Sequence, residues 1–153
     1  MKAASLIIIA FVTACAAVGS TTAADRAALD QTTDSVQTNG SLRLETHDAP
    51  LTPSNSAYDT VPQFTGVAGA ITIARAQLGS LCLTALTGSA DRQGDRIGVH
   101  ILFTERLTSC TGEVRVLQYN ATVTAPAGTY NVALVHERNG VVDTIARKSV
   151  TVR

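Results

Sequence analysis

Several residue types are scarce in this 153-residue chain, and each shortage excludes a class of protein. There is no tryptophan, and aromatic residues make up 4% of the chain, which excludes aromatic cages and large stacking platforms. Charged residues make up 16% and the net charge is zero, unlike the strongly basic composition of a typical nucleic-acid-binding protein. No apolar run reaches the roughly 20 residues that span a bilayer, so a multi-span membrane protein is excluded.

The first 24 residues have the pattern of an export signal. Lys2 provides a positive charge, a short apolar run follows, and small residues lead to a cleavage site near Ala23 or Ala24. We therefore predict a signal peptide over residues 1–24. An alternative is that Val12-Thr13-Ala14-Cys15, which resembles a bacterial lipobox, places a lipidated Cys15 at the mature N-terminus. Otherwise Cys15 is removed with the peptide.

Residues 25–62 are poor in apolar side chains, rich in Thr, Ser, Asp and Pro, and carry a net charge of −4. Such a segment buries too little apolar surface to offset its chain entropy, so we predict a flexible acidic linker. Only the stretch from Ser41 to Glu45 alternates in the manner of a short strand.

Residues 63–153 are richer in apolar residues and carry a net charge of +3. Their apolar positions alternate with a period of two, most clearly from Ile97 to Phe103, and no segment has helical periodicity. Asn139-Gly140 separates two alternating runs and is a strong signal for a two-residue hairpin turn. We therefore predict a single all-β domain, an antiparallel β-sandwich of about 6–7 strands.

Cys82 and Cys110 are the two cysteines that follow the export signal. In an exported protein such a pair most simply forms a disulfide, which would stabilise the domain by about 3–4 kcal/mol. The alternatives are a metal site and a catalytic thiol. A metal site would need further ligands, and no suitably spaced histidine pair accompanies the cysteines.

The stretch from Pro126 to His136, with its Pro-x-Gly-x-Tyr-x-Val core and the following Asn139-Gly140, resembles the closing hairpin of immunoglobulin-like and fibronectin type III-like domains. The resemblance, which extends over residues 66–153, is to small exported bacterial proteins of unknown function. It implies a tyrosine corner, in which Tyr130 hydrogen-bonds upstream backbone, and it includes the Cys82–Cys110 pair. The chain departs from antibody domains because position 132 is Val rather than Cys.

The sequence offers no convergent set of catalytic residues. No nucleophile motif or phosphate loop is present, and His47, His100 and His136 lie far apart in the sequence. We therefore predict no catalytic residues, no metal site and no cofactor, and we expect that the protein is not an enzyme.

These observations predict an exported, non-catalytic immunoglobulin-like module that serves as a structural or binding protein of the cell envelope. Its expected partner is a protein or a glycan rather than nucleic acid, with membrane contact only through a lipid anchor at Cys15. The expected location is extracytoplasmic. The alternative is a small periplasmic ligand-binding or inhibitor protein that uses the loops around Arg92 and Arg106.

Overall fold

A computed structural model describes residues 33–51, 60–80, 82–105 and 114–153. These residues contain nine strands and no helix, so no helix within them could cross a membrane. The all-β prediction is confirmed, and seven of the nine strands lie within residues 63–153, where six or seven were expected. They are β1 (Thr33–Asn39), β2 (Leu42–Pro50), β3 (Gln63–Val67), β4 (Ala70–Ser80), β5 (Leu83–Gln93), β6 (Arg96–Glu105), β7 (Val114–Thr124), β8 (Gly128–Arg138) and β9 (Val141–Val152).

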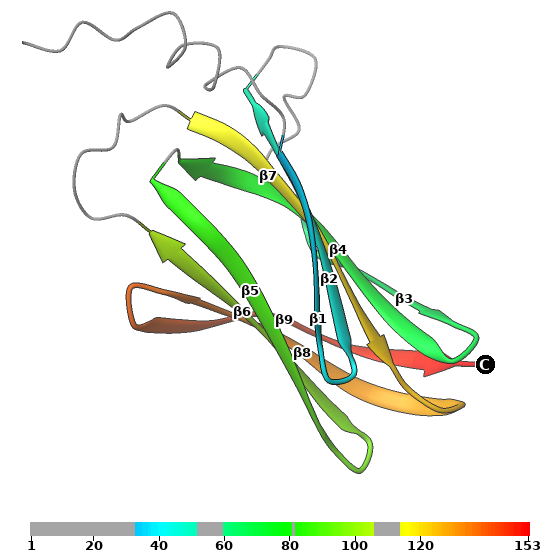
Figure 1. Cartoon of the computed structure of the whole chain (residues 1–153). Helices are drawn as coiled ribbons and strands as arrows, with labels where there is room; N and C mark the ends of the chain where they lie inside the picture. The colour runs from blue at the N-terminus through cyan, green and yellow to red at the C-terminus, as the bar shows by residue number, and fades with distance from the viewer. Residues whose placement is uncertain (1–32, 52–59, 81, 106–113) are drawn as a thin grey trace, which may run out of the picture.

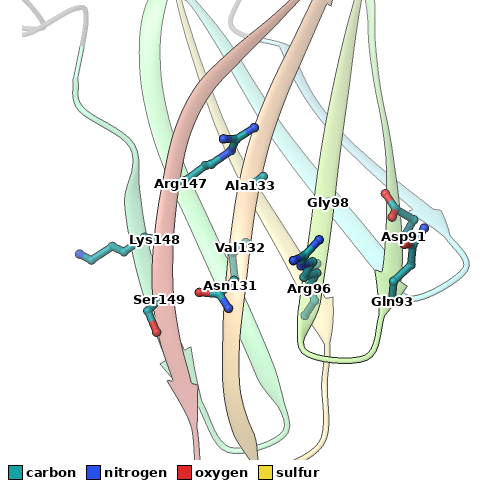
Figure 2. Close-up of a pocket in the computed structure, with 11 residues that line it drawn as sticks. Asp91, Gln93, Arg96, Gly98, Asn131, Val132, Ala133, Arg147, Lys148 and Ser149 are labelled. Carbon is teal, nitrogen blue, oxygen red and sulfur yellow. The ribbon is translucent and has the colours of Figure 1, made fainter.

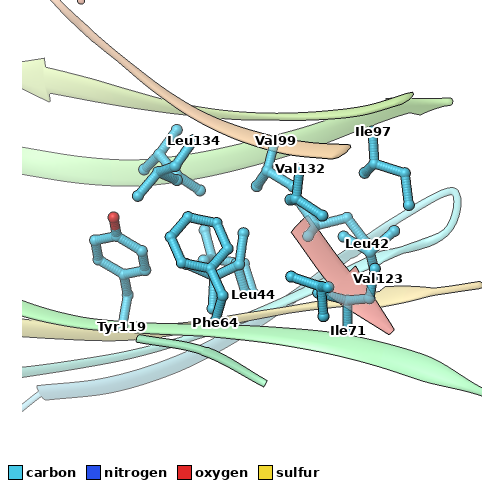
Figure 3. Close-up of a cluster of buried hydrophobic side chains, with 14 of the residues drawn as sticks. Leu42, Leu44, Phe64, Ile71, Ile97, Val99, Tyr119, Val123, Val132 and Leu134 are labelled. Atoms are coloured by element: carbon cyan, nitrogen blue, oxygen red, sulfur yellow. The ribbon is translucent and has the colours of Figure 1, made fainter. Parts of the chain in front are cut away.

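The nine strands form two sheets that face each other (Figure 1). The first sheet has the order β1-β2-β7-β4-β3, and the second has the order β5-β6-β8-β9. Apolar side chains from both sheets fill the space between them, as Figure 3 shows. Burial of this shared face is the main force that holds the sheets together. The result is a sandwich-like fold.

Two strands of the first sheet lie within residues 25–62, where we predicted a flexible linker. β2 pairs with β1 on one side and with β7 on the other, and it places Leu42 and Leu44 in the core with 1% of their surface exposed. The prediction is therefore wrong for the range Thr33–Pro50. The low apolar content of residues 25–62 suggested a linker, but a strand with only one buried face needs few apolar side chains. The backbone of β2 also gains hydrogen bonds from its pairing with β7.

The pairing of β6 with β8 is parallel, from Arg96↔Asn131 to Phe103↔Arg138, whereas the six other pairs in the described sheets are antiparallel. The prediction of a wholly antiparallel sandwich is wrong at this pair. Its cause is the chain path: after β6 the chain crosses to the first sheet, forms β7 and returns as β8. This long crossover allows β8 to run in the same direction as β6.

The inward-facing side chains change character along the strands. On β4, Ile71 and Ile73 are completely buried, and the next positions of the same alternation are Arg75 and Gln77. On β8, Val132 and Leu134 are followed by His136. We call the part of the interior around Ile71, Ile73, Val132 and Leu134 the apolar end, and the part around Arg75, Gln77 and His136 the polar end.

The two sheets approach each other closely at one edge of the apolar end, where β3 meets β9. A Cβ added to Gly66 would lie 2.0 Å from the carbonyl oxygen of Thr151. Because that oxygen belongs to the backbone, no side-chain rotation could relieve the clash. Glycine at position 66 is therefore what permits β3 and β9 to meet.

The predicted hairpin turn at Asn139-Gly140 joins β8 to β9. Both residues have positive φ, 52° for Asn139 and 77° for Gly140. Two consecutive positive φ values are what a two-residue turn of type I′ requires, and Asn followed by Gly tolerates them best. The turn begins the closing strand of the fold.

Candidate functional site

The three histidines, His47, His100 and His136, do not meet in one site. His100 lies on the outer face of the second sheet, where its Nε2 is 3.1 Å from Glu137 Oε2. His136 faces the interior and is 8% exposed, and His47 pairs with Asp34 between β2 and β1. Throughout the described ranges, no group of three or more His, Cys, Asp or Glu side chains could hold a metal ion.

The His136 ring forms a buried pair with Tyr119 of β7 across the sandwich. Tyr119 Oη and His136 Nε2 are 2.6 Å apart, and the His136 ring also packs against Phe103. Burial raises the pKa of the Tyr119 phenol well above its usual range, and the nearby Arg75 guanidinium opposes part of that rise. The phenol therefore stays protonated at ordinary pH.

Of the two arginine loops of our alternative hypothesis, the structure describes only the one that holds Arg92. Arg92 lies over the ring of Tyr130, 5.1 Å from its centre, and donates a hydrogen bond to the Gly94 carbonyl. Arg106 lies outside the described residues. Tyr130 in turn donates a hydrogen bond of 2.9 Å to the Pro126 carbonyl, the kind of upstream contact that the resemblance implies.

Two other predicted features fall partly or wholly beyond what the structure describes. Cys82 is half-buried between β4 and β5, but Cys110 lies outside the described residues, so the disulfide between them stays a prediction. The signal peptide and Cys15 also lie outside the described residues.

A groove of about 740 Å³ lies on the outer face of the second sheet. Its centre is one row of residues across all four strands, because Asp91 pairs with Gly98, Gly98 with Ala133 and Ala133 with Arg147. Two small residues in mid-row leave a trough between an acidic and a basic side chain. Asp91 lies so close to Gly98 that a Cβ there would be 2.5 Å from Asp91 Oδ1.

The next row of the same face supplies polar side chains, from Gln93 through Arg96 and Asn131 to Ser149. Figure 2 shows Arg147 extending from β9 toward β8, near Ala133, while Lys148 extends from β9 in the other direction. Neither Arg96 nor Arg147 forms an ion pair with any residue that the structure describes. The groove therefore presents two uncommitted guanidinium groups, with polar hydrogen-bonding groups between them.

Nothing in the sequence alone indicated that Arg96 and Arg147 would lie in one groove. The residues of the trough come from four strands, and their alignment depends on the parallel register of β6 and β8. The one local signal was the small residue at an outward position of each central strand, Gly98 and Ala133.

Comparison with known proteins gives no relative for this chain: no family model, no curated protein and no solved structure matches it.

Proposed function

We propose that this protein is an exported, non-catalytic binding module of the cell envelope, and that the groove on the outer face of its second sheet binds an acidic glycan. The observation that carries the proposal is the trough at Gly98 and Ala133, flanked by the unpaired guanidinium groups of Arg96 and Arg147. Guanidinium groups bind carboxylate and sulfate oxygens with two parallel hydrogen bonds.

The shape of the groove supports a chain-like ligand. The groove is open and crosses the strands, with Asp91 and Gln93 at one side and Arg147 and Ser149 at the other. Asn, Gln, Ser and Asp side chains supply the donors and acceptors that sugar hydroxyls need. A sugar ring carrying a carboxylate would place its charge beside the arginines and its hydroxyls along the polar row.

The immunoglobulin-like assignment and export belong to the same proposal. The Tyr130–Pro126 hydrogen bond and the closing β8–β9 hairpin support the assignment, while the parallel β6–β8 pair departs from the antiparallel sheets of that fold. We propose that Cys82 and Cys110 form a disulfide in the exported protein. Mass spectrometry after alkylation should show no reactive thiol at these positions without reductant, and two alkylated thiols would contradict the proposal.

The binding proposal is tested by calorimetric titration with polygalacturonate, a linear carboxylated polysaccharide. Binding should weaken as salt rises, because the interaction is partly between charges. Replacing both arginines, Arg96→Gln and Arg147→Gln, should lower the affinity at least tenfold, and Ala133→Leu should lower it by filling the trough. Arg43→Gln is the matched control, because Arg43 is equally an exposed strand arginine but lies on β2 of the other sheet.

Two results would contradict the proposal. One is equal binding of dextran, a neutral polysaccharide, since that would leave the arginines without a role. The other is an equal loss of affinity with Arg43→Gln, since that would show attraction to the whole surface rather than binding in the groove.

A further inference from the structure

A second hollow of about 540 Å³ opens between the two sheets at the polar end of the interior. It is distinct from the groove, because its walls are the inner faces of β4, β6, β8 and β9. Its volume lies within the range of about 300–1,000 Å³ that is typical of small-molecule sites. We call it the interlayer cleft, and the residues that matter for its chemistry are Arg75, Gln77, Leu78, Phe103, His136 and Val141.

One polar group that lines the interlayer cleft is the side-chain amide of Gln77, a residue that is 7% exposed. The amide makes no hydrogen bond with any residue of the described ranges. The amide therefore offers its hydrogen-bonding groups to whatever occupies the cleft. The Gln77 amide can donate and accept, so a ligand with a polar head could satisfy it.

The charges around the interlayer cleft favour an anionic head. Arg75 lies beside Gln77 on the same face of β4 and places a positive charge at the polar floor. Arg75 also interacts with the Tyr119 phenol, and Arg138, the second arginine of the lining, is 3.4 Å from the Glu105 carboxylate and lies over the ring of Phe103. The acidic residue of the lining, Asp143, is exposed on β9 rather than buried.

The mouth of the interlayer cleft carries apolar side chains beside the exposed polar residues Arg138, Asn139 and Asp143. Leu78 of β4 is 43% exposed and Val141 of β9 is 61% exposed, and both line the hollow together with the ring of Phe103. Apolar side chains that are left in water at the rim of a cavity gain free energy when an apolar ligand covers them. The lining thus combines Gln77 and Arg75 with the apolar side chains of Phe103, Leu78 and Val141, which suits a molecule with one charged end and one apolar end.

We propose that the interlayer cleft binds a small aliphatic carboxylic acid, with its carboxylate at Gln77 and Arg75 and its hydrocarbon chain against Phe103, Leu78 and Val141. This site is independent of the glycan groove, because no residue lines both hollows. The protein would then carry two ligands, one on a sheet face and one between the sheets.

Calorimetric titration with octanoate tests this proposal, with octylamine as the probe of opposite charge. Octanoate should bind at least tenfold more tightly than octylamine. Gln77→Leu, which keeps the volume of the side chain but removes the amide, should lower octanoate affinity at least fivefold. Val141→Asp should lower it by a similar factor, because it places a second anion at the apolar mouth.

Val142→Asp is the matched control for the variant at the mouth. Val142 is as exposed as Val141 and is its neighbour, but it does not line the cleft, so octanoate affinity should be unchanged. The variant Arg147→Gln, in the glycan groove, should also leave octanoate affinity unchanged. Absence of octanoate binding would overturn the proposal, as would equal effects of Val141→Asp and Val142→Asp, or tighter binding of octylamine.

Discussion

Where β3 crosses β9, the interior holds Ile71 and Val152 and the backbones of the two strands nearly touch. Farther along the same strand β4, the inward positions hold Arg75 and Gln77, and the sheets enclose a hollow instead of packing together. The strand alternation is the same in both regions, and only the residue type changes. The comparison teaches that inward-facing positions in this fold serve two purposes: packing at the apolar end and, we propose, binding at the polar end.

The largest loss of stability at the apolar end should come from removing β1 and β2, the strands that complete the first sheet. A chain that begins at residue 63 lacks β2 and therefore loses Leu42 and Leu44, each worth about 1.5–3 kcal/mol of burial. It also leaves the β7 edge unpaired. Because domains of this size are stable by only about 5–15 kcal/mol, we expect this chain to be unfolded or aggregated by circular dichroism.

A chain that begins at residue 25 is the control and should be folded. Cooperative unfolding of the chain that begins at residue 63, at an unchanged midpoint, would show that residues 25–62 are a linker after all. It would also show that the apolar end does not depend on them.

A smaller loss of stability should follow from a substitution at Gly66, where β3 and β9 lie close together. Gly66→Ala places a methyl group against the Thr151 carbonyl, so the strands must separate, and we expect a loss of about 1–3 kcal/mol in urea unfolding. Gly79→Ala is the matched control in β4, because the nearest atom to an added Cβ there is 3.6 Å away. Equal stability of the two variants would contradict tight closure at the apolar end.

A smaller, pH-dependent effect should come from Tyr119, which lies toward the polar end. Tyr119→Phe removes the hydrogen bond to His136 and should cost about 1–2 kcal/mol near neutral pH. Burial raises the pKa of the folded phenol above the value near 10 of the unfolded chain. The contribution of this phenol to the free energy of unfolding is therefore intact below pH 10. It is lost as the pH rises above 10, because the phenol then ionises more readily in the unfolded chain than in the folded one.

The measurement is urea unfolding of both proteins between pH 8 and pH 11. The native chain should lose more stability above pH 10 than Tyr119→Phe does. Tyr130→Phe, which removes the other described tyrosine hydroxyl, should retain the steep alkaline loss because Tyr119 is still present. An identical alkaline loss in Tyr119→Phe and the native chain would contradict the proposed burial of the phenol.

Local patterns predicted the strands and the turn between them. The alternation from Ile97 to Phe103 identified β6, and Asn139-Gly140 identified the turn before β9, because both depend only on neighbouring residues. The same alternation at Leu42 and Leu44 was visible, but the acidic composition around it outweighed two apolar residues. A strand with one buried face needs a partner in space, and β7 is about seventy residues away in sequence.

The candidate sites could not be derived in this way. The trough between Asp91 and Arg147 exists only because β6 and β8 are parallel, and a long crossover through the other sheet decides that direction. Gln77 and Arg75 occupy inward positions of β4 that sequence reasoning assigns to apolar residues. Polar residues at such positions are a sequence signal for a site within the sandwich, provided that the strand and its phase are known.

We expect the polar end of the interior to contribute less to stability than the apolar end does. Urea unfolding of two variants of β4, Ile71→Ala and Gln77→Leu, compares the two ends on one strand. Ile71→Ala should lose about 2–5 kcal/mol, because it leaves a cavity at a completely buried position. Gln77→Leu should keep the native stability to within about 1 kcal/mol, because the Gln77 amide forms no hydrogen bond with the described residues that the variant would break. A loss of 2 kcal/mol or more in Gln77→Leu, comparable to that in Ile71→Ala, would contradict the claim.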